Sequence, residues 1–377
     1  MDDYIDPSEI LGDILSDWRD YWHGESPYER TLSLLRHMVA LPYPDECLPL
    51  VVSYLWANPK FSSVLPVLFC YGQPGSAKSN LAIIASKLRE SDPLNADNCT
   101  AVSLRNTCNS QKFLDAEAAF EADGALLILD NVQTATFREN RNLLSLFLGG
   151  YKRGQDKVQI GGKDGANIEF YTFSSRIISS VEPLHLEYDL RELASRCWVV
   201  PHQQLDKIPD ETLSRQGFSI EDSIKPEDVN WQNFSSEYLK FWGSKANCKL
   251  FAACKKSLRN TEKFAPRAWE MSRDVLATGM AIGAFEDAKK AKLALARYQM
   301  LMDSFEAQST PLEEILKDDF LSKVNGVAEL DNALLVHFID GQTNKKNFLE
   351  RPKPKAIEDA MKRLGWHKRK GQWIKAN

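Results

Sequence analysis

Residues 64–85 read VLPVLFCYGQPGSAKSNLAIIA, and this stretch decides how the rest of the chain is interpreted. The apolar run at residues 65–71 predicts a buried strand, and Lys78 opens an apolar helix after a turn rich in Gly, Pro and Ser. This order suits polyphosphate, because the N–H groups of the loop and the positive end of the helix dipole converge on negative oxygens. In such a loop the lysine reaches the β- and γ-phosphates, and the next hydroxyl, here Ser79, ligates Mg²⁺.

The loop differs from the usual Walker A spacing, G-x-x-x-x-G-K-S, at a single position. Ala77 stands where the second glycine is expected, and its methyl group crowds the turn. The flanking strand and helix favour a nucleotide site over a chance turn before a Lys-Ser pair. The predicted nucleotide-binding residues form one run, consisting of Gly72, Gln73, Pro74, Gly75, Ser76, Ala77, Lys78, Ser79 and Asn80.

The composition predicts a globular protein of two or three domains. The chain has 377 residues, of which 43% are hydrophobic and 26% charged. No apolar run approaches the roughly 18 residues of a membrane span, and the acidic start MDDYIDPSE does not resemble a signal peptide. Seven scattered cysteines without a C-x-x-C pair, and six isolated histidines, predict free thiols in a cytoplasmic protein and no zinc site.

The charge is unevenly distributed along the chain. The net charge is −5, yet residues 345–377 contain eleven Lys and Arg against three acidic residues, a local charge of +8. A basic tail on an acidic body predicts an anionic polymer as a partner, with a merely solvated basic face as the alternative.

A second apolar stretch, ALLILDN at residues 125–131, predicts a buried strand that ends in Asp130. A carboxylate at that position completes a Mg²⁺ site with the loop hydroxyl, so we expect Ser79 and Asp130 to share the metal. Asn131 follows, and an amide orients water but cannot take its proton. Either hydrolysis is slow, or another carboxylate such as Glu139 or Glu182 activates the water.

The remaining segments of this region also have recognisable periodicities. Two β-prone segments flank the sequence GGKDG, which predicts a hairpin with Lys163 at its tip. The other expected elements are helices within residues 8–57, a strand at 99–104, a helix at 111–123, a helix at 138–151 and a strand at 176–184.

Polar residues near the last of these strands are candidates for contacts with the γ-phosphate. Ser179 and Ser180 are the expected sensors, and Arg176 faces either the nucleotide or a neighbouring subunit. Arg196 ends a short helix before the β-like CWVV, where an arginine finger is expected, and Arg191 is a weaker alternative. Either arginine could instead pair with a core carboxylate.

These pieces together resemble a known family. The segments PVLFCYGQPGSAKSNL, LLILDNVQ, FYTFSSRIISSVEPL, LASRCWVVP and RAWEMSRDVLATG are similar to the AAA+ helicase ATPases of phages, plasmids and mobile islands. These are the superfamily 3 and related helicases that accompany primase or primase-polymerase modules. The resemblance covers residues 45–300. Members often have Ala at the position of Ala77, whereas Asn131 replaces their usual acidic residue and puts the rate of turnover in question.

The resemblance implies a hexameric ring with ATP and Mg²⁺ bound between subunits, and 3′-to-5′ or DNA-loading motor activity. In ring ATPases that thread nucleic acid, a hairpin at this place carries a cation, here Lys163, into the central channel. Arg196 would act on the nucleotide of the neighbouring subunit. Priming would need a separate primase or polymerase, since no primase motif precedes the ATPase segment.

The last third of the chain is predicted to be mainly helical. Residues 203–230 are expected to form a linker, and 232–303 a helical lid in which Arg267 is either a second γ-phosphate sensor or a solvated helix end. Three short helices and a two-stranded segment then follow, which is the pattern of a winged helix that binds DNA or, alternatively, protein. We expect Trp366 and Trp373 to pack this wing. The residues expected to contact DNA phosphates are Lys368, Arg369 and Lys370.

The sequence therefore predicts an α/β protein built around a P-loop AAA+ ATPase core. The expected domains are an N-terminal helical collar (1–60), the ATPase core (61–202), a linker and helical lid (203–305) and a winged helix (306–377). The expected function is ATP-dependent unwinding or translocation of single-stranded or forked DNA in the host cytosol or nucleoid. The alternatives are a DNA-bound ATP switch, such as a loader or transposition regulator, and an AAA+ remodeller that does not bind nucleic acid.

Overall fold

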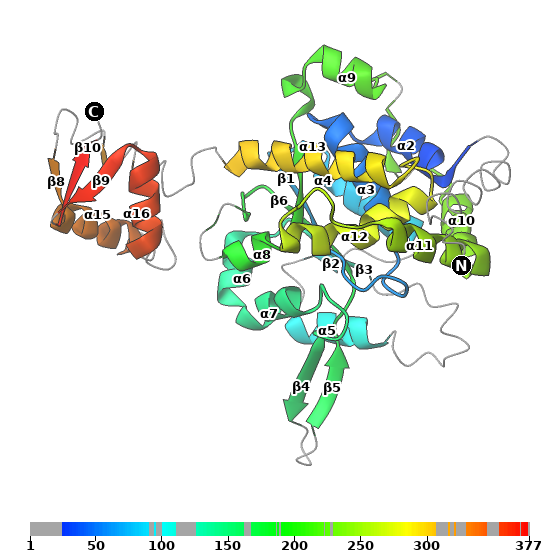
Figure 1. Ribbon diagram of the computed structural model, residues 1–377, viewed down its shortest axis with the longest axis horizontal. Helices are drawn as coiled ribbons and strands as arrows, with labels where there is room; N and C mark the ends of the chain where they lie inside the picture. Colours follow the sequence, from blue (N-terminus) through cyan, green and yellow to red (C-terminus); the bar gives the residue numbers. More distant parts are fainter. Residues whose placement is uncertain are drawn as a thin grey trace, which may run out of the picture. The chain divides into compact units, whose positions relative to one another are not determined.

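A computed structural model describes most of the chain, which divides into two compact units (Figure 1). The first unit comprises Met1–Pro183 and Ser195–Leu301, and the second Leu184–Ala194 and Met302–Asn377. The described residues are 25–89, 94–95, 100–110, 126–161, 167–185, 187, 190–221, 223–226, 229–306, 316, 320–321, 329–344, 354–369 and 371–375.

A five-stranded parallel sheet forms the centre of the first unit. Its strands lie in the order β2-β3-β6-β1-β7, so the strand before the Walker A loop and the strand ending in Asp130 are separated by β6. Parallel strands share one carboxyl edge, and polar groups that end different strands meet there. The strands are β1 (Val67–Gly72), β2 (Leu94–Asn95), β3 (Leu126–Asp130), β6 (Ser175–Ser180) and β7 (Cys197–His202).

Several predicted elements of this core are confirmed. β1 and β3 are the two buried strands expected from the apolar runs, and α4 (Lys78–Leu88) begins at the predicted lysine. This helix packs against β1, β3 and β6. The helices α2 (Pro27–Met38) and α3 (Pro44–Trp56) also form as the periodicity predicts.

The prediction of a strand at residues 99–104 is wrong. Ala101–Ser110 form helix α5, because Thr100 and Ser103 exchange side chain-to-backbone hydrogen bonds of 3.1 Å that start a helix. The sheet takes its edge strand β2 from Leu94–Asn95 instead. The helix predicted at 111–123 lies outside the described residues.

The single helix predicted at residues 138–151 is two helices, α6 (Thr134–Glu139) and α7 (Arg141–Gly149). Asn140 separates them, since its side chain accepts a hydrogen bond of 3.0 Å from Leu143 N and caps the second helix. The strand predicted at 176–184 is shorter than expected and ends at Ser180 as β6.

The predicted hairpin forms between β4 (Lys157–Gly161) and β5 (Asn167–Tyr171), which pair in antiparallel register. It extends away from the sheet in Figure 1, and α5 contacts β5. The tip with Lys163 lies outside the described residues.

The linker predicted at residues 203–230 contains a docked helix, α9 (Asp210–Gln216). Gln216 is buried and its side chain accepts a hydrogen bond of 2.9 Å from Leu41 N and donates to the Val39 carbonyl. The polar composition of this segment suggested a loop. In the structure, the buried side-chain amide of Gln216 serves as the hydrogen-bond partner of Val39 and Leu41, in the segment after α2.

Residues 232–303 are helical as predicted, but they form four helices where the periodicity suggested three. They are α10 (Gln232–Gly243), α11 (Lys245–Ser257), α12 (Pro266–Ala281) and α13 (Ala288–Glu306). Helix α12 packs against α3 and α11, so the N-terminal helices and the helices of the expected lid belong to one unit with the sheet. The boundaries predicted at residues 60 and 202 stay predictions.

The second unit contains a three-stranded antiparallel sheet in the order β8-β10-β9, with helices α15 (Asn332–Asn344) and α16 (Pro354–Arg363). The predicted hairpin is β9 (Trp366–Arg369) and β10 (Gln372–Lys375), while β8 (Glu329–Asp331) was not predicted. Trp366 and Trp373 are 4% and 2% exposed, which confirms that they pack the core of this unit. Among the helices that the structure describes, none has the length and apolar character required to span a bilayer.

Candidate nucleotide-binding site

The loop predicted to be a Walker A loop, residues 73–77, lies between the carboxyl end of β1 and the start of α4. Gln73, Pro74 and Gly75 are exposed, whereas Lys78 is buried at the base of the loop. Lys78 Nζ donates to the Gln73 carbonyl at 3.0 Å and to Ser76 Oγ at 3.5 Å. Burial lowers the pKa of Lys78, and the carboxylate of Asp130 partly offsets this effect. The ammonium group is therefore held inside the loop, where a bound anion would be its counter-charge.

Ala77 adopts the left-handed conformation, with φ of 57° and ψ of 24°, immediately before α4. The sequence predicted crowding by its methyl group, and the structure identifies the cost as backbone strain. Left-handed backbone costs a non-glycine residue about 1–2 kcal/mol. The loop therefore keeps the peptide conformation that a glycine would adopt more easily.

Asp130 is the centre of the polar contacts at this edge of the sheet. Its carboxylate accepts a hydrogen bond of 3.0 Å from Ser79 Oγ, the hydroxyl that follows the loop lysine. Ser179 Oγ, at the end of β6, also donates to Asp130. The structure thus brings together three predicted site residues from three different elements.

These oxygens fit a magnesium ion bound together with a nucleotide. Carboxylate and hydroxyl oxygens are the ligand types that Mg²⁺ takes in such sites, where it keeps several waters and phosphate oxygens. Ser79 and Asp130 are already within hydrogen-bond distance of each other. Among the described residues, no group of three or more His, Cys, Asp and Glu side chains forms a metal site of its own. A magnesium ion at Ser79 and Asp130 would need further oxygen ligands, such as those of a phosphate.

Asn131 directly follows Asp130 and is exposed at the same edge. It has a φ of 57°, and its N–H group lies 3.1 Å from both Asp130 Oδ1 and Ser179 Oγ. Asparagine tolerates this left-handed conformation better than most residues. The turn thereby holds the backbone of Asn131 against Asp130 and Ser179.

The two carboxylates considered for water activation differ in position. Glu182 follows β6 and accepts hydrogen bonds from the N–H and hydroxyl groups of Thr134, at the start of α6. It therefore lies near the segment after Asp130. Glu139 is exposed at the last position of α6. Of the two carboxylates, Glu182 is the one that is hydrogen-bonded to the segment following the carboxyl end of β3.

The other serine proposed as a sensor, Ser180, is fully buried and donates to the Val132 carbonyl at 2.5 Å. It supports the turn after β3. Of the two serines proposed as sensors, Ser179 is the one whose hydroxyl contacts Asp130. Asn80 also turns away from the loop, since its side chain donates to the Met38 carbonyl at 2.9 Å.

Arg176 faces neither the nucleotide site nor a surface, contrary to both expectations for it. Its side chain is 1% exposed and donates to the carbonyls of Leu146 and Phe147, at the end of α7. It also binds Thr172 and Ser174, after the hairpin. These oxygen atoms accept the hydrogen bonds of the buried guanidinium. Arg176 therefore connects α7, the residues after the hairpin and β6.

Arg196 and Arg267 meet at the opposite, amino edge of the sheet. Their guanidinium carbons lie 5.0 and 4.5 Å from the ring centroid of Tyr151, and Arg267 Nη1 donates to the Tyr151 hydroxyl at 2.8 Å. The Tyr151 carbonyl accepts from Leu65 N, just before β1 begins. β1 spans six residues, which separates its ends by about 16 Å. Arg267 therefore lies at the edge of the sheet remote from its own loop, and its role as a γ-phosphate sensor stays a prediction.

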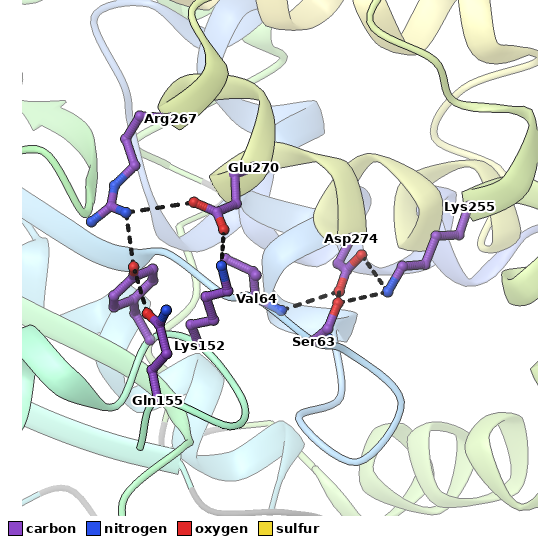
Figure 2. A network of polar contacts seen from close by, with 9 residues as sticks. Ser63, Val64, Lys152, Gln155, Lys255, Arg267, Glu270 and Asp274 are labelled. Carbon is purple, nitrogen blue, oxygen red and sulfur yellow. Dashed lines mark hydrogen bonds and ion pairs between the residues drawn. The ribbon is translucent and has the colours of Figure 1, made fainter. Parts of the chain in front are cut away.

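Figure 2 shows the polar network that holds α12 against this amino edge. Glu270 pairs with Lys152 and with Arg267. Asp274 accepts hydrogen bonds from the N–H groups of Ser63 and Val64 and an ion pair of 2.7 Å from Lys255. Side chains of α12 and α11 thereby fix the segment that leads into β1.

The residues expected to contact DNA lie in the second unit or outside the described chain. Lys368 extends over the ring of Trp373, with Nζ 5.7 Å from the centroid. Arg369 is the next residue of β9 and points to the other face of the sheet, opposite Gln372. Lys370 lies outside the described residues. Arg191, which is the weaker candidate for an arginine finger and not a DNA contact, is exposed at the start of α8 (Arg191–Ala194). Lys368 and Arg369 thus do not share one face of the wing.

Two residues near the loop carry no recognisable motif in the sequence. His202 Nδ1 lies 3.2 Å from the Ser76 carbonyl, and Gln204 Nε2 donates to the Pro74 carbonyl at 3.0 Å. His202 ends β7 and Gln204 follows it by two residues, so they come 126 and 130 residues after their partners in the loop. The sequence could have indicated these contacts only if the pairing of β7 with β1 had been known.

No protein-family model matches this sequence, and no curated protein matches it significantly. Among solved structures, the fold superposes on the SCCmec type IV Cch protein, described as an active helicase, with a TM-score of 0.45 and 11% identity. That alignment covers 89% of this chain and 69% of the other. The apo C-terminal region of NrS-1 aligns with a TM-score of 0.33 and 13% identity, over 92% and 74% of the two chains. At these low similarities, we base the function on the geometry of the site.

Proposed function

We propose that the chain is a P-loop ATPase of the AAA+ type, related to the superfamily 3 helicases. Its proposed activity is the unwinding or translocation of single-stranded or forked DNA by a homo-oligomeric ring, with a hexamer as the expected form. A role in the replication of a phage, plasmid or mobile element, beside a separate primase or polymerase, belongs to the same proposal.

The observation that carries this proposal is the convergence of four side chains at the carboxyl edge of the sheet. Lys78 and Ser79 lie at the start of α4, Asp130 ends β3 and Ser179 lies in β6, and hydrogen bonds join Asp130 to both serines. A glycine-containing loop followed by a helix N-terminus supplies the amide donors for phosphate. A lysine, a hydroxyl and a carboxylate complete the set that phosphoryl transfer requires.

Each residue has a distinct part in the proposed reaction. Lys78 would bind the β- and γ-phosphates, and Ser79 and Asp130 would hold a magnesium ion. When bound, the metal neutralises charge that develops on the phosphate oxygens. Ser179 orients the carboxylate, and Asn131 orients the attacking water, whose proton passes to a carboxylate such as Glu182.

The position of Arg196 supports a pocket completed by a second copy of the chain. It lies at the end of the sheet remote from its own loop, since its carbonyl accepts from Val67 N at the start of β1. A guanidinium there reaches a nucleotide only across a subunit boundary, where an arginine finger stabilises transition-state charge. The proposal therefore requires an oligomer.

The proposed test is ATP turnover by the full chain with and without single-stranded DNA. We expect DNA to stimulate the wild-type protein, and Lys78→Ala and Arg196→Ala to abolish turnover. Arg196→Ala should still bind nucleotide, because the cis pocket stays complete. A wild-type protein that remains a single copy in the presence of ATP and DNA would contradict the ring.

A second candidate function is a DNA-bound ATP switch, and Asn131 is the observation that favours it. An amide at the position next to Asp130 cannot accept a proton, which suits a protein that holds ATP for long periods. Fork unwinding that is lost in Lys163→Ala would exclude the switch. DNA affinity that disappears on deletion of residues 345–377 would exclude a remodeller that does not bind nucleic acid.

A further inference from the structure

The end of β7 holds the Walker A loop from the side opposite its exposed surface. In the pairing of β1 with β7, Gly72 lies opposite His202. A Cβ atom at Gly72 would lie 2.2 Å from the His202 carbonyl oxygen, so the two backbones approach as closely as glycine allows. The position of the loop is therefore tied to the last residues of β7.

Two side chains extend this contact into the loop itself. His202 Nδ1 lies 3.2 Å from the Ser76 carbonyl oxygen, so it is the ring nitrogen that carries the donated proton. Gln204 Nε2 donates to the Pro74 carbonyl at 3.0 Å. Both carbonyl groups of the loop are thereby drawn toward β7.

The direction of these carbonyls determines the direction of the next amides. In a planar trans peptide, the C=O and N–H groups point in opposite directions. When the Pro74 and Ser76 carbonyls point toward β7, the N–H groups of Gly75 and Ala77 point away from it, toward the open side of the loop. Those N–H groups are the donors that a phosphate would meet.

Within the described part of the fold, the imidazole of His202 makes no hydrogen bond besides the one to Ser76. It is 3% exposed, and Nε2 is buried without a hydrogen-bond partner among the described residues. A buried polar atom without a partner costs free energy, which an apolar side chain at this position would avoid. The contribution of the imidazole is therefore to the loop and not to the stability of the sheet.

We propose that His202 and Gln204 are positioning residues for the nucleotide, which orient the Gly75 and Ala77 amides toward the triphosphate. This inference rests on the proposed function, since it concerns the same loop. It adds that the affinity for triphosphate is set in part by β7, whose residues touch no phosphate themselves.

The test is equilibrium binding of ATP with Mg²⁺ to the full chain and its variants. Loss of one donor in His202→Leu is expected to weaken ATP binding by roughly tenfold. His202→Asn, whose side-chain N–H₂ replaces Nδ1, should bind within about threefold of the wild type. Gln204→Ala should also weaken binding, while the exposed neighbour variant Gln203→Ala serves as the control and should not.

Two further readouts separate positioning from a structural role. In steady-state turnover, the KM for ATP should rise in His202→Leu while kcat stays near the wild-type value. The free energy of unfolding without nucleotide should change little, because removal of the buried unpaired Nε2 offsets the loss of the hydrogen bond to the Ser76 carbonyl. A structural role alone predicts the reverse, with lower stability and unchanged affinity of the folded protein.

The outcomes are distinguishable from failure of the proposed function. If neither the wild type nor Lys78→Ala binds ATP, the nucleotide site itself is refuted. If the wild type binds ATP and both His202→Leu and Gln204→Ala bind it equally well, the positioning role is wrong. Should His202→Leu fail to fold, Gln204→Ala decides, since its side chain is only partly buried.

Discussion

The two edges of the parallel sheet use similar polar groups for different purposes. At the carboxyl edge, Ser79 and Asn131 are exposed and lie beside Asp130, and the loop before α4 is open to solvent. At the amino edge, Arg196 and Arg267 lie on the ring of Tyr151, and carboxylates of α12 bind the lysines and amides around them. The first edge leaves its loop open to a ligand, whereas the second packs its arginines against Tyr151 and pairs the carboxylates of α12 with neighbouring side chains.

This contrast explains why charge alone is a poor guide to a site. Arginine is among the residue types that phosphate sites use most, yet Arg176 is enclosed by main-chain carbonyls. Lys78 is also buried, but its partners are carbonyl and hydroxyl oxygens of a loop that faces solvent. The neighbours of a cation decide whether it binds a ligand or supports the structure.

The strongest test of the contrast is the removal of the loop lysine. Lys78→Ala should reduce ATP turnover by about a thousandfold, which corresponds to about 4 kcal/mol of transition-state stabilisation. Lys87→Ala, at the exposed end of the same helix, is the matched control and should leave turnover unchanged. Equal effects of the two variants would mean that the loop is not a nucleotide site.

The complementary variant is Arg176→Met, which should act on stability. It leaves several buried carbonyl groups without their donor, and we expect the free energy of unfolding to fall by about 3 kcal/mol or more. Arg141→Met, exposed at the start of α7, should change it little. Chemical denaturation measures both. A fully stable Arg176→Met protein with impaired turnover would instead assign this arginine to the reaction.

Acid should lower the free energy of unfolding through His202, which lies at the carboxyl edge of the sheet. Burial lowers the pKa of His202 from 6.5 to about 4, and the nearby charge of Lys78 acts in the same direction. Between these two pH values the unfolded chain binds a proton that the folded protein does not, so stability falls as the pH falls. The loss from this group amounts to about 3 kcal/mol.

Denaturation curves of the wild type and His202→Asn, recorded between pH 7 and pH 4, measure this contribution. The variant should lose less stability than the wild type over this range, because its side chain does not titrate. Parallel pH profiles of the two proteins would show that His202 takes up its proton equally in both states.

The smallest expected effect concerns the residue that departs from the Walker A pattern. Ala77→Gly should stabilise the protein by about 1 kcal/mol or less, because glycine accepts a φ of 57° without strain but loses more freedom on folding. Thermal unfolding detects this change, and Ala82→Gly in the middle of α4 is a control with the opposite sign. Destabilisation by Ala77→Gly would mean that the methyl group contributes packing that outweighs the strain.

Much of the carboxyl edge could be predicted from the sequence because its signals are local. An apolar run, a Gly- and Pro-containing turn and a Lys-Ser pair are contiguous, so β1, the loop and α4 follow from about twenty residues. Asp130 was predictable for the same reason, as the polar end of a second apolar run. The helix α5 was missed because Thr100 and Ser103 start a helix where a β-prone composition suggested a strand.

The sequence by itself thus determined the strand–loop–helix unit, the carboxylate at the end of β3 and the packing of Trp366 and Trp373. Only the tertiary structure decided that Arg176 is enclosed, that Arg267 lies at the amino edge, and that His202 contacts the loop. The physical reason is that these contacts depend on which distant strands pair side by side. A local pattern specifies how a segment folds, but the order of strands in the sheet specifies its neighbours.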